Sequence, residues 1–252
     1  MRHSATLIHS SLCASTLAAA SVLLGNAASF GSVTFTGSGF NPEVNAAASG
    51  SALFHVSGNT LTITLTNTTA PRTTAQGNAL TGIVFDVVGA SPTLSLTSLA
   101  LGSGSEIWTS ESSSNTNGAL NGSWTSVLGS TPLAGYGAAT TGFNGAFNGG
   151  SISLGNSSPN YGIVSAGTFN GSNVPFGGSQ FPFIQNSLTL SFSGATGITN
   201  SQFGNVRFLF GTDGTGVITG QQVPAPGALA LLATAAALGA RRRRSPPDGA
   251  TA

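Results

Sequence analysis

The nearest approach to a catalytic set in this chain is a pair of acids, Glu106 and Glu111, which flank Trp108. Two carboxyl groups beside an aromatic ring are the groups that glycoside hydrolases use, one as general acid and the other as base or nucleophile. The separation of the two carboxyl groups decides that chemistry, and a short polar segment between two acids does not fix it. We therefore predict no catalytic residues and expect a protein that is not an enzyme.

The other reactive side chains are too scattered to form a metal or hydrolytic site, which needs several converging His, Cys, Asp or Glu residues. His55 alternates with Phe54 and Val56 and is expected on the outer, half-exposed face of a strand. Cys13 is the single cysteine and lies in an N-terminal apolar segment. We expect no metal and no cofactor.

Two aspartates have structural interpretations. Asp86 follows three apolar residues of a predicted strand, and a structural ion pair with Arg72 or Arg207, or a hydrogen bond, is favoured over a role as general base. The segment Asp213-Gly214-Thr215-Gly216 resembles a protease or phosphate-binding motif, but it follows a strand and no helix follows it. A turn explains it better.

The segments that must position these side chains have the period of β-strands. Residues 60–66 alternate Thr with Leu or Ile, so that the apolar side chains share one face and the threonines the other. Gly58-Asn59 separates this run from an alternating run at 52–57, which predicts a hairpin. Further strands are predicted at 33–36, 82–88, 93–101, 187–193 and 206–210.

The predicted strand at 93–101 contains an irregularity. Its leucines fall at 94 and 96 and then at 99 and 101, so the apolar face changes within the strand. This change predicts a bulge or a bend. Because many short strands occur without a helical period, we predict an all-β fold, an antiparallel β-sandwich with a jelly-roll arrangement.

The middle of the body, residues 102–182, is rich in Gly, Asn and Ser with scattered aromatic residues. So long a loop is unusual in a compact domain, and we expect several short strands joined by surface loops. Trp108 and Trp124 lie in this stretch and have two interpretations. They fill the core, or they are exposed platforms on which sugar rings stack.

Both ends of the chain have the pattern of targeting segments that are removed from the mature protein. Residues 1–28 have a short basic head, a mostly apolar stretch and small residues before Ala27 and Ala28, which predicts a signal peptide cut after one of these two. At the other end Pro224-Ala225-Pro226 is followed by the apolar run 227–240 and by Arg241, Arg242, Arg243 and Arg244. An apolar run stopped by arginines matches a membrane segment whose basic end stays cytoplasmic.

Charge excludes one class of partner. Residues 29–222, which we call the body, remain when the two terminal segments are removed. The body has two arginines, five acids and no lysine, so its net charge is about −3. Nucleic-acid binding depends on neutralising phosphates with Lys and Arg. We therefore expect no nucleic-acid partner.

The arrangement of the C-terminal residues resembles a known bacterial signal. The order Pro224-Ala225-Pro226, apolar helix and Arg cluster, at 223–244, is similar to the PEP-CTERM sorting signal of proteins processed by an exosortase. Family members share an N-terminal signal peptide and a weakly charged Gly/Ser/Thr/Asn-rich body. This sequence has Ala225 where the family motif has Glu. Residues 245–252 form the predicted disordered tail.

The resemblance implies a function outside the cell. It implies a non-enzymatic surface or extracellular-matrix protein, exported by the secretion machinery and held in the inner membrane until an exosortase-type peptidase cleaves it near Pro224, Ala225 and Pro226. Extracellular polysaccharide is the expected partner of a hydrated Thr/Ser/Asn-rich surface. The alternative is a carbohydrate-binding module, with glycoside activity ranked below binding, that uses Trp108 and Trp124.

Overall fold

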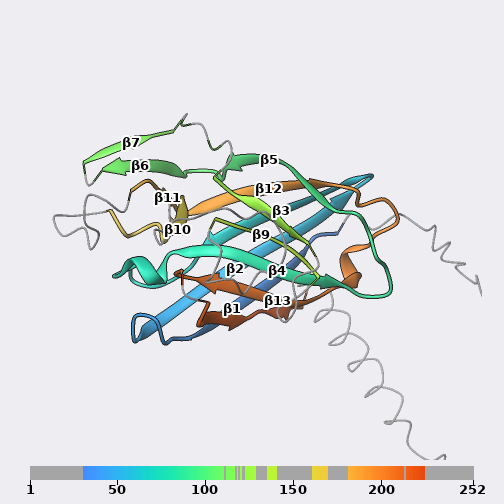
Figure 1. Ribbon diagram of the computed structural model, residues 1–252, viewed down its shortest axis with the longest axis horizontal. Coiled ribbons are helices and arrows are strands. Elements are labelled where there is room, and N and C mark those ends of the chain that lie inside the picture. Colours follow the sequence, from blue (N-terminus) through green and yellow to red (C-terminus); the bar gives the residue numbers. More distant parts are fainter. Residues whose placement is uncertain are drawn as a thin grey trace, which may run out of the picture.

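The protein is all-β in the part that the computed structural model describes, which is residues 31–110, 112–116, 118, 120, 123–128, 135–140, 161–169, 181–212 and 214–224. Strands make up nearly all of its regular structure (Figure 1). Two 3-10 helices of three residues interrupt them, η1 (Gln76–Asn78) and η3 (Asn200–Gln202). The described residues contain no α-helix, as the strand periodicity predicts.

The first sheet has six strands in the order β15-β1-β2-β3-β12-β5. All of its pairs are antiparallel. The strands are β1 (Val33–Asn41), β2 (Ala46–Ser57), β3 (Thr60–Asn67), β5 (Ser95–Leu101), β12 (Ser187–Ser193) and β15 (Gln221–Val223). Three of them, β1, β2 and β3, follow one another in the chain as a meander, and β15 covers the outer edge of β1.

The second sheet has nine strands. Its main path runs β14-β13-β4-β10-β11-β6-β7, while β9 pairs with β4 and with β8. The strands are β4 (Leu80–Val87), β6 (Glu106–Ser110), β7 (Ser113–Asn115), β8 (Thr125–Leu128), β9 (Tyr136–Ala139), β10 (Gly162–Val164), β11 (Phe183–Gln185), β13 (Phe203–Phe210) and β14 (Gly216–Thr219). The pair β10–β11 is parallel, so this sheet is mixed. The prediction of an antiparallel sandwich is wrong for this pair.

The two sheets enclose the main apolar core, which makes the fold sandwich-like. Phe54 of β2 is completely buried and meets Phe85 of β4 and Phe203 of β13 with ring centroids 5.2 and 4.8 Å apart. These contacts join strands of opposite sheets. Aromatic pairs in edge-on or tilted geometry add to the stabilisation that burial itself supplies.

The alternation in the sequence translates directly into the first sheet. Leu61, Ile63 and Leu65 of β3 are fully buried, and the threonines between them are half-buried or exposed on the outer face. Gly58, with a φ of 59°, and Asn59 form the turn between β2 and β3. The predicted hairpin is confirmed, because a left-handed turn residue is what a tight antiparallel connection requires.

The predicted irregularity at 93–101 is a β-bulge at Thr97. Ser98 pairs with Ser191, but the next residue of β12, Phe192, pairs with Leu96, so Thr97 has no partner in the register. The extra residue brings Leu96, Leu99 and Leu101 to the same side, where they pack against the core. The leucine spacing that looks wrong for a regular strand is correct for a bulged one.

The Gly/Asn/Ser-rich middle contains strands as predicted. In its described parts, β6, β7, β8, β9 and β10 have three to five residues each. Figure 1 shows β6 and β7 at one end of the sandwich, beyond β10 and β11. β13 and β14 pair as an antiparallel hairpin, from Phe210 opposite Gly216 onward, so the segment predicted as a turn falls mostly in the connection between them. Asp213 lies outside the described residues, and Gly216 is already the first residue of β14.

Candidate functional site

Trp124, one of the two predicted sugar platforms, lies inside the protein. It is 3% exposed and belongs to the main core. Its indole N–H donates a hydrogen bond to the carbonyl oxygen of Tyr161 at 3.1 Å. A buried indole has no free face to offer a sugar ring, so core filling is the role that the structure gives Trp124.

Trp108 is half-buried on β6 and belongs to a different aromatic cluster. Its ring stacks on Phe169 with centroids 4.3 Å apart and planes inclined by 18°. Phe181 and Phe183 continue this cluster, with their centroids 5.5 Å apart. The indole N–H of Trp108 donates to the side-chain oxygen of Gln185 at 2.8 Å. The two tryptophans therefore do not combine into one platform.

Only one of the two acids near Trp108 is described. Glu106 stands on β6 opposite Gln185, and Glu111 lies outside the described residues. In the described part of the chain, no group of three or more His, Cys, Asp or Glu residues could hold a metal ion. His55 is half-buried on the outer face of β2, as predicted.

Asp86 has a structural role, as predicted. One carboxylate oxygen accepts a hydrogen bond from the backbone N–H of Gly135 at 2.8 Å, and the other accepts from the side-chain amide of Asn205 at 2.7 Å. These contacts tie β4 to the residue before β9 and to β13. The hydrogen-bond form of the prediction is confirmed.

Tyr136 follows Gly135 and has a shifted ionisation. Its ring stacks on Phe85 with centroids 6.0 Å apart. Burial raises the pKa of the Tyr136 hydroxyl above its ordinary value of 10.0, and the Asp86 carboxylate raises it further. The folded protein therefore holds this proton to higher pH than the unfolded chain does. The free energy of unfolding therefore falls as the pH rises above 10.0 and through the higher folded pKa, because ionisation of Tyr136 costs more in the folded protein than in the unfolded chain.

We predict that Asp86→Asn lowers the pKa of Tyr136, because it removes one of the two causes of the shift and can keep the hydrogen bond from Gly135. The measurement is a tyrosinate absorbance titration, with Tyr136→Phe to separate this group from Tyr161. Glu106→Gln serves as the control, because it removes an acid that is not among the causes of the Tyr136 shift. An unchanged Tyr136 titration in Asp86→Asn contradicts the prediction.

A buried network of asparagines is the polar feature that the sequence analysis missed. Asn67, 2% exposed, donates to the carbonyl oxygens of Asn78 and Ile163 at 2.9 and 2.7 Å and accepts from the N–H of Thr69 at 3.0 Å. Asn41, completely buried, donates to the carbonyl of Gly77 and to the side chain of Asn78. The network holds the segment between β3 and β4 against the ends of β1 and β3.

The residues of the predicted C-terminal signal lie partly within the described chain. Pro224 is its last described residue and directly follows β15, which pairs with β1 through Thr34–Val223 and Thr36–Gln221. Ala225, Pro226, the apolar run and Arg241–Arg244 lie outside the described residues, as do Ala27 and Ala28. No helix in the described part has the length and apolar character needed to cross a membrane.

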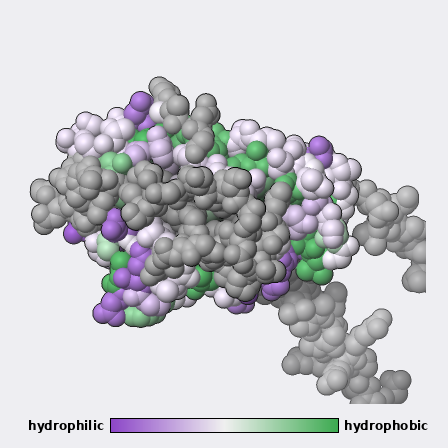
Figure 2. All heavy atoms as spheres, in the orientation of Figure 1, coloured by the Kyte–Doolittle hydropathy of each residue, from purple (hydrophilic) through white to green (hydrophobic). Residues whose placement is uncertain are grey.

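Comparisons of the chain with protein-family models, with curated proteins and with solved structures give no match. Figure 2 shows that the described surface on the visible face is mostly pale, with few strongly hydrophilic side chains. This surface agrees with the Ser/Thr/Gly-rich, weakly charged composition of the body.

Proposed function

We propose that this chain is a non-enzymatic bacterial surface or extracellular-matrix protein, exported through its N-terminal signal and cleaved at its C-terminal signal by an exosortase-type membrane peptidase. The observation that carries the proposal is the order of Pro224-Ala225-Pro226, apolar run and four arginines. In this proposal the body is held at the inner membrane first and is then released or transferred to the cell surface.

The position of the folded body supports the proposal. Its last strand, β15, ends at Val223, one residue before Pro224. The buried core residues lie between Val33 and Ile218, so cleavage at or after Pro224 leaves these residues and every described strand in place. A signal that begins after Val223 can be removed without loss of any described strand.

We propose that the two sheets of the sandwich-like fold are connected as in a jelly roll. The chain passes from one sheet to the other between β3 and β4, β4 and β5, β5 and β6, β11 and β12, β12 and β13, and β14 and β15. Repeated crossings between two sheets are a feature of a jelly roll. The β1-β2-β3 meander is an addition to that scheme.

Intact-mass analysis of the exported protein tests the processing. We expect a species that begins after Ala27 or Ala28 and ends near Pro224–Pro226 in cells with the peptidase, and a membrane-bound species with the complete tail in cells without it. Pro224→Ala combined with Pro226→Ala should reduce cleavage because both changes fall in the motif. The matched control is Pro246→Ala combined with Pro247→Ala, two prolines of the same tail. An exported species that keeps Arg241–Arg244 overturns the proposal.

A further inference from the structure

The outer face of the first sheet is hollowed along β1 and β2 by two adjoining grooves. The first, of about 440 Å³, is lined by Thr36, Gly37, Ser38, Ser49, Gly50, Thr68, Thr219 and Gln221. The second, of about 420 Å³, is lined by Ser38, Gly39, Ala47, Ala48, Ser49, Thr69 and Ala70. They share Ser38 and Ser49, so they form one continuous depression, which we call the β1–β2 groove. Each half has the volume of a small-ligand site.

The floor of the β1–β2 groove is main chain. Gly37 and Gly50 face each other across β1 and β2. The ring of Phe208 lies directly beneath them, because a Cβ on Gly50 would stand 2.9 Å from Phe208 Cδ1 and a Cβ on Gly37 would stand 3.0 Å from Phe208 Cδ2. A side chain at either glycine would collide with this ring, so the core below fixes the floor.

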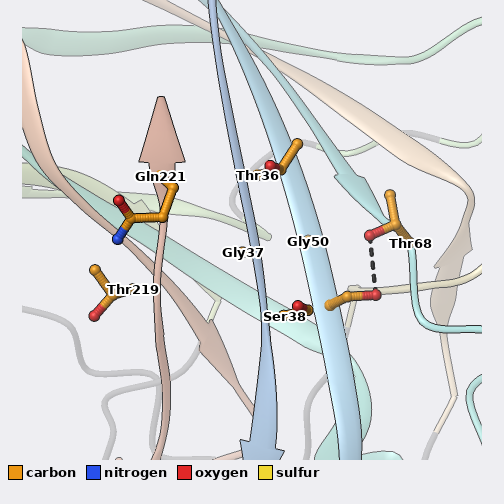
Figure 3. A pocket seen from close by; sticks show the side chains of 8 residues that line it. Thr36, Gly37, Ser38, Gly50, Thr68, Thr219 and Gln221 are labelled. Carbon is orange, nitrogen blue, oxygen red and sulfur yellow. Dashed lines mark hydrogen bonds between the residues drawn. The ribbon is translucent and has the colours of Figure 1, made fainter. Parts of the chain in front are cut away.

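Residues on both sides of β1 form the walls, and hydrogen bonds hold the wall on the side of β2. Figure 3 shows Gln221 and Thr219 on one side and Thr68 on the other, beyond β2. Thr68 donates from its backbone N–H to the Ser49 carbonyl at 2.9 Å and from its hydroxyl to the Ser49 hydroxyl at 3.0 Å. The hydroxyl of Thr69 accepts from the Ser49 N–H at 3.1 Å. The wall at 68–69 is therefore anchored to β2.

The chemistry of the β1–β2 groove is that of uncharged hydrogen bonding. Its lining contains hydroxyls of Ser and Thr and the amide of Gln221, and neither half is lined by a charged residue. Each hydroxyl can donate one hydrogen bond and accept two, and the amide can do both as well. Such a lining matches the alternating donors and acceptors of a polyhydroxylated, neutral molecule. It offers nothing to neutralise a phosphate or a carboxylate.

An exposed aromatic ring stands beside the β1–β2 groove. Phe40 is 61% exposed, follows Ser38 on the same face of β1, and pairs with Ala47, which lines the second half. An exposed phenyl ring beside hydroxyls can cover the C–H face of a sugar ring, because both surfaces leave water when they stack. This is the combination that the tryptophans do not provide.

The geometry points to the β1–β2 groove as a binding site for a neutral polysaccharide, with Phe40 as the stacking platform and Thr36, Ser38 and Gln221 as hydrogen-bonding partners of the sugar hydroxyls. The site is on the opposite sheet from Trp108. It would give the exported body a partner outside the cell, and it stands independently of the processing step.

The test is retention of the exported protein on three insoluble neutral supports, cellulose, chitin and cross-linked dextran, with calcium alginate beads as the anionic comparison. We expect retention on at least one neutral support. Phe40→Ala should lower the affinity about three- to tenfold through loss of the stacking surface. The matched control is Val88→Ala, a 63% exposed residue at the end of β4, outside the groove, which should not alter retention.

A second pair of variants tests the hydroxyls without changing side-chain size. Thr36→Val should reduce the affinity about two- to tenfold by removing one hydrogen bond. Thr60→Val, at an exposed threonine of the same sheet outside the groove, should not. No retention on any neutral support, equal retention by Phe40→Ala and the wild type, or retention on alginate alone overturns the proposal. The retention assay does not depend on where the C-terminus of the protein is cleaved. Its outcome is therefore separate from that of the processing experiment.

Discussion

Phe54→Ala should lower the free energy of unfolding of the body by about 3–5 kcal/mol. Phe54 is completely buried and contacts rings from both sheets, Phe35 at 5.4 Å on its own sheet and Phe85 and Phe203 on the other. Truncation removes apolar contacts on every side and leaves a cavity that strands on both sides cannot fill without shifting. The measurement is equilibrium denaturation of the purified protein in urea.

The neighbouring residue supplies a matched control. Leu53 precedes Phe54 on β2, points to the outer face, and is 40% exposed. Leu53→Ala should change the free energy of unfolding by no more than about 0.5 kcal/mol. Equal losses from the two variants would contradict the assignment of the inner and outer faces of β2.

Asn67→Ala should cost about 3 kcal/mol or more. The variant leaves the carbonyl oxygens of Asn78 and Ile163 and the N–H of Thr69 without the partner they have in the buried network. Each stranded buried group costs about 1–3 kcal/mol. The same urea denaturation measures the loss. Asn67→Asp should also be destabilising, because it keeps the acceptor for Thr69 but loses both donors.

The control for Asn67 is the residue before it. Thr66 is half-buried on the outer face of β3, and Thr66→Ala leaves the inner network intact. We expect a loss well below that of Asn67→Ala. A stability of Asn67→Ala equal to that of Thr66→Ala would mean that the network does not hold the segment between β3 and β4.

The strands that the sequence predicts are those long enough to show a period. β3 alternates over eight residues, and the bulge in β5 follows from the spacing of its leucines. β10 and β11 have three residues each, and a period of two is not visible in so short a segment. Their parallel pairing joins Gly162–Val164 to Phe183–Gln185, across a polar stretch with no periodic pattern. Contacts with the rest of the fold, and not a local sequence pattern, determine where such short strands form and how they pair.

The same distinction explains the candidate sites. The burial of the two tryptophans depends on residues far along the chain. Phe169 stacks on Trp108, and the carbonyl oxygen of Tyr161 accepts the hydrogen bond of Trp124. The asparagine network, by contrast, could be found in the sequence. Asn67 continues the inward positions of β3 after Leu65, and Asn41 lies an even number of residues after Phe35. An amide that falls on the core face of a strand must find buried partners.

Because β15 pairs with β1, the two ends of the described body lie next to each other. Thr34 and Val223 are register partners, so the first and last strands enter and leave at the same point of one sheet. Partners across an antiparallel pair lie about 5 Å apart, and a linker of a few residues could join the two ends. New termini could then be opened at Gly58-Asn59, in the turn between β2 and β3. A circular permutant of this kind would keep every described strand and its core contacts. Its new termini would lie at the same end of the first sheet as the old ones, because Thr34 pairs with both Val223 and Leu53, and Leu53 is near the end of β2.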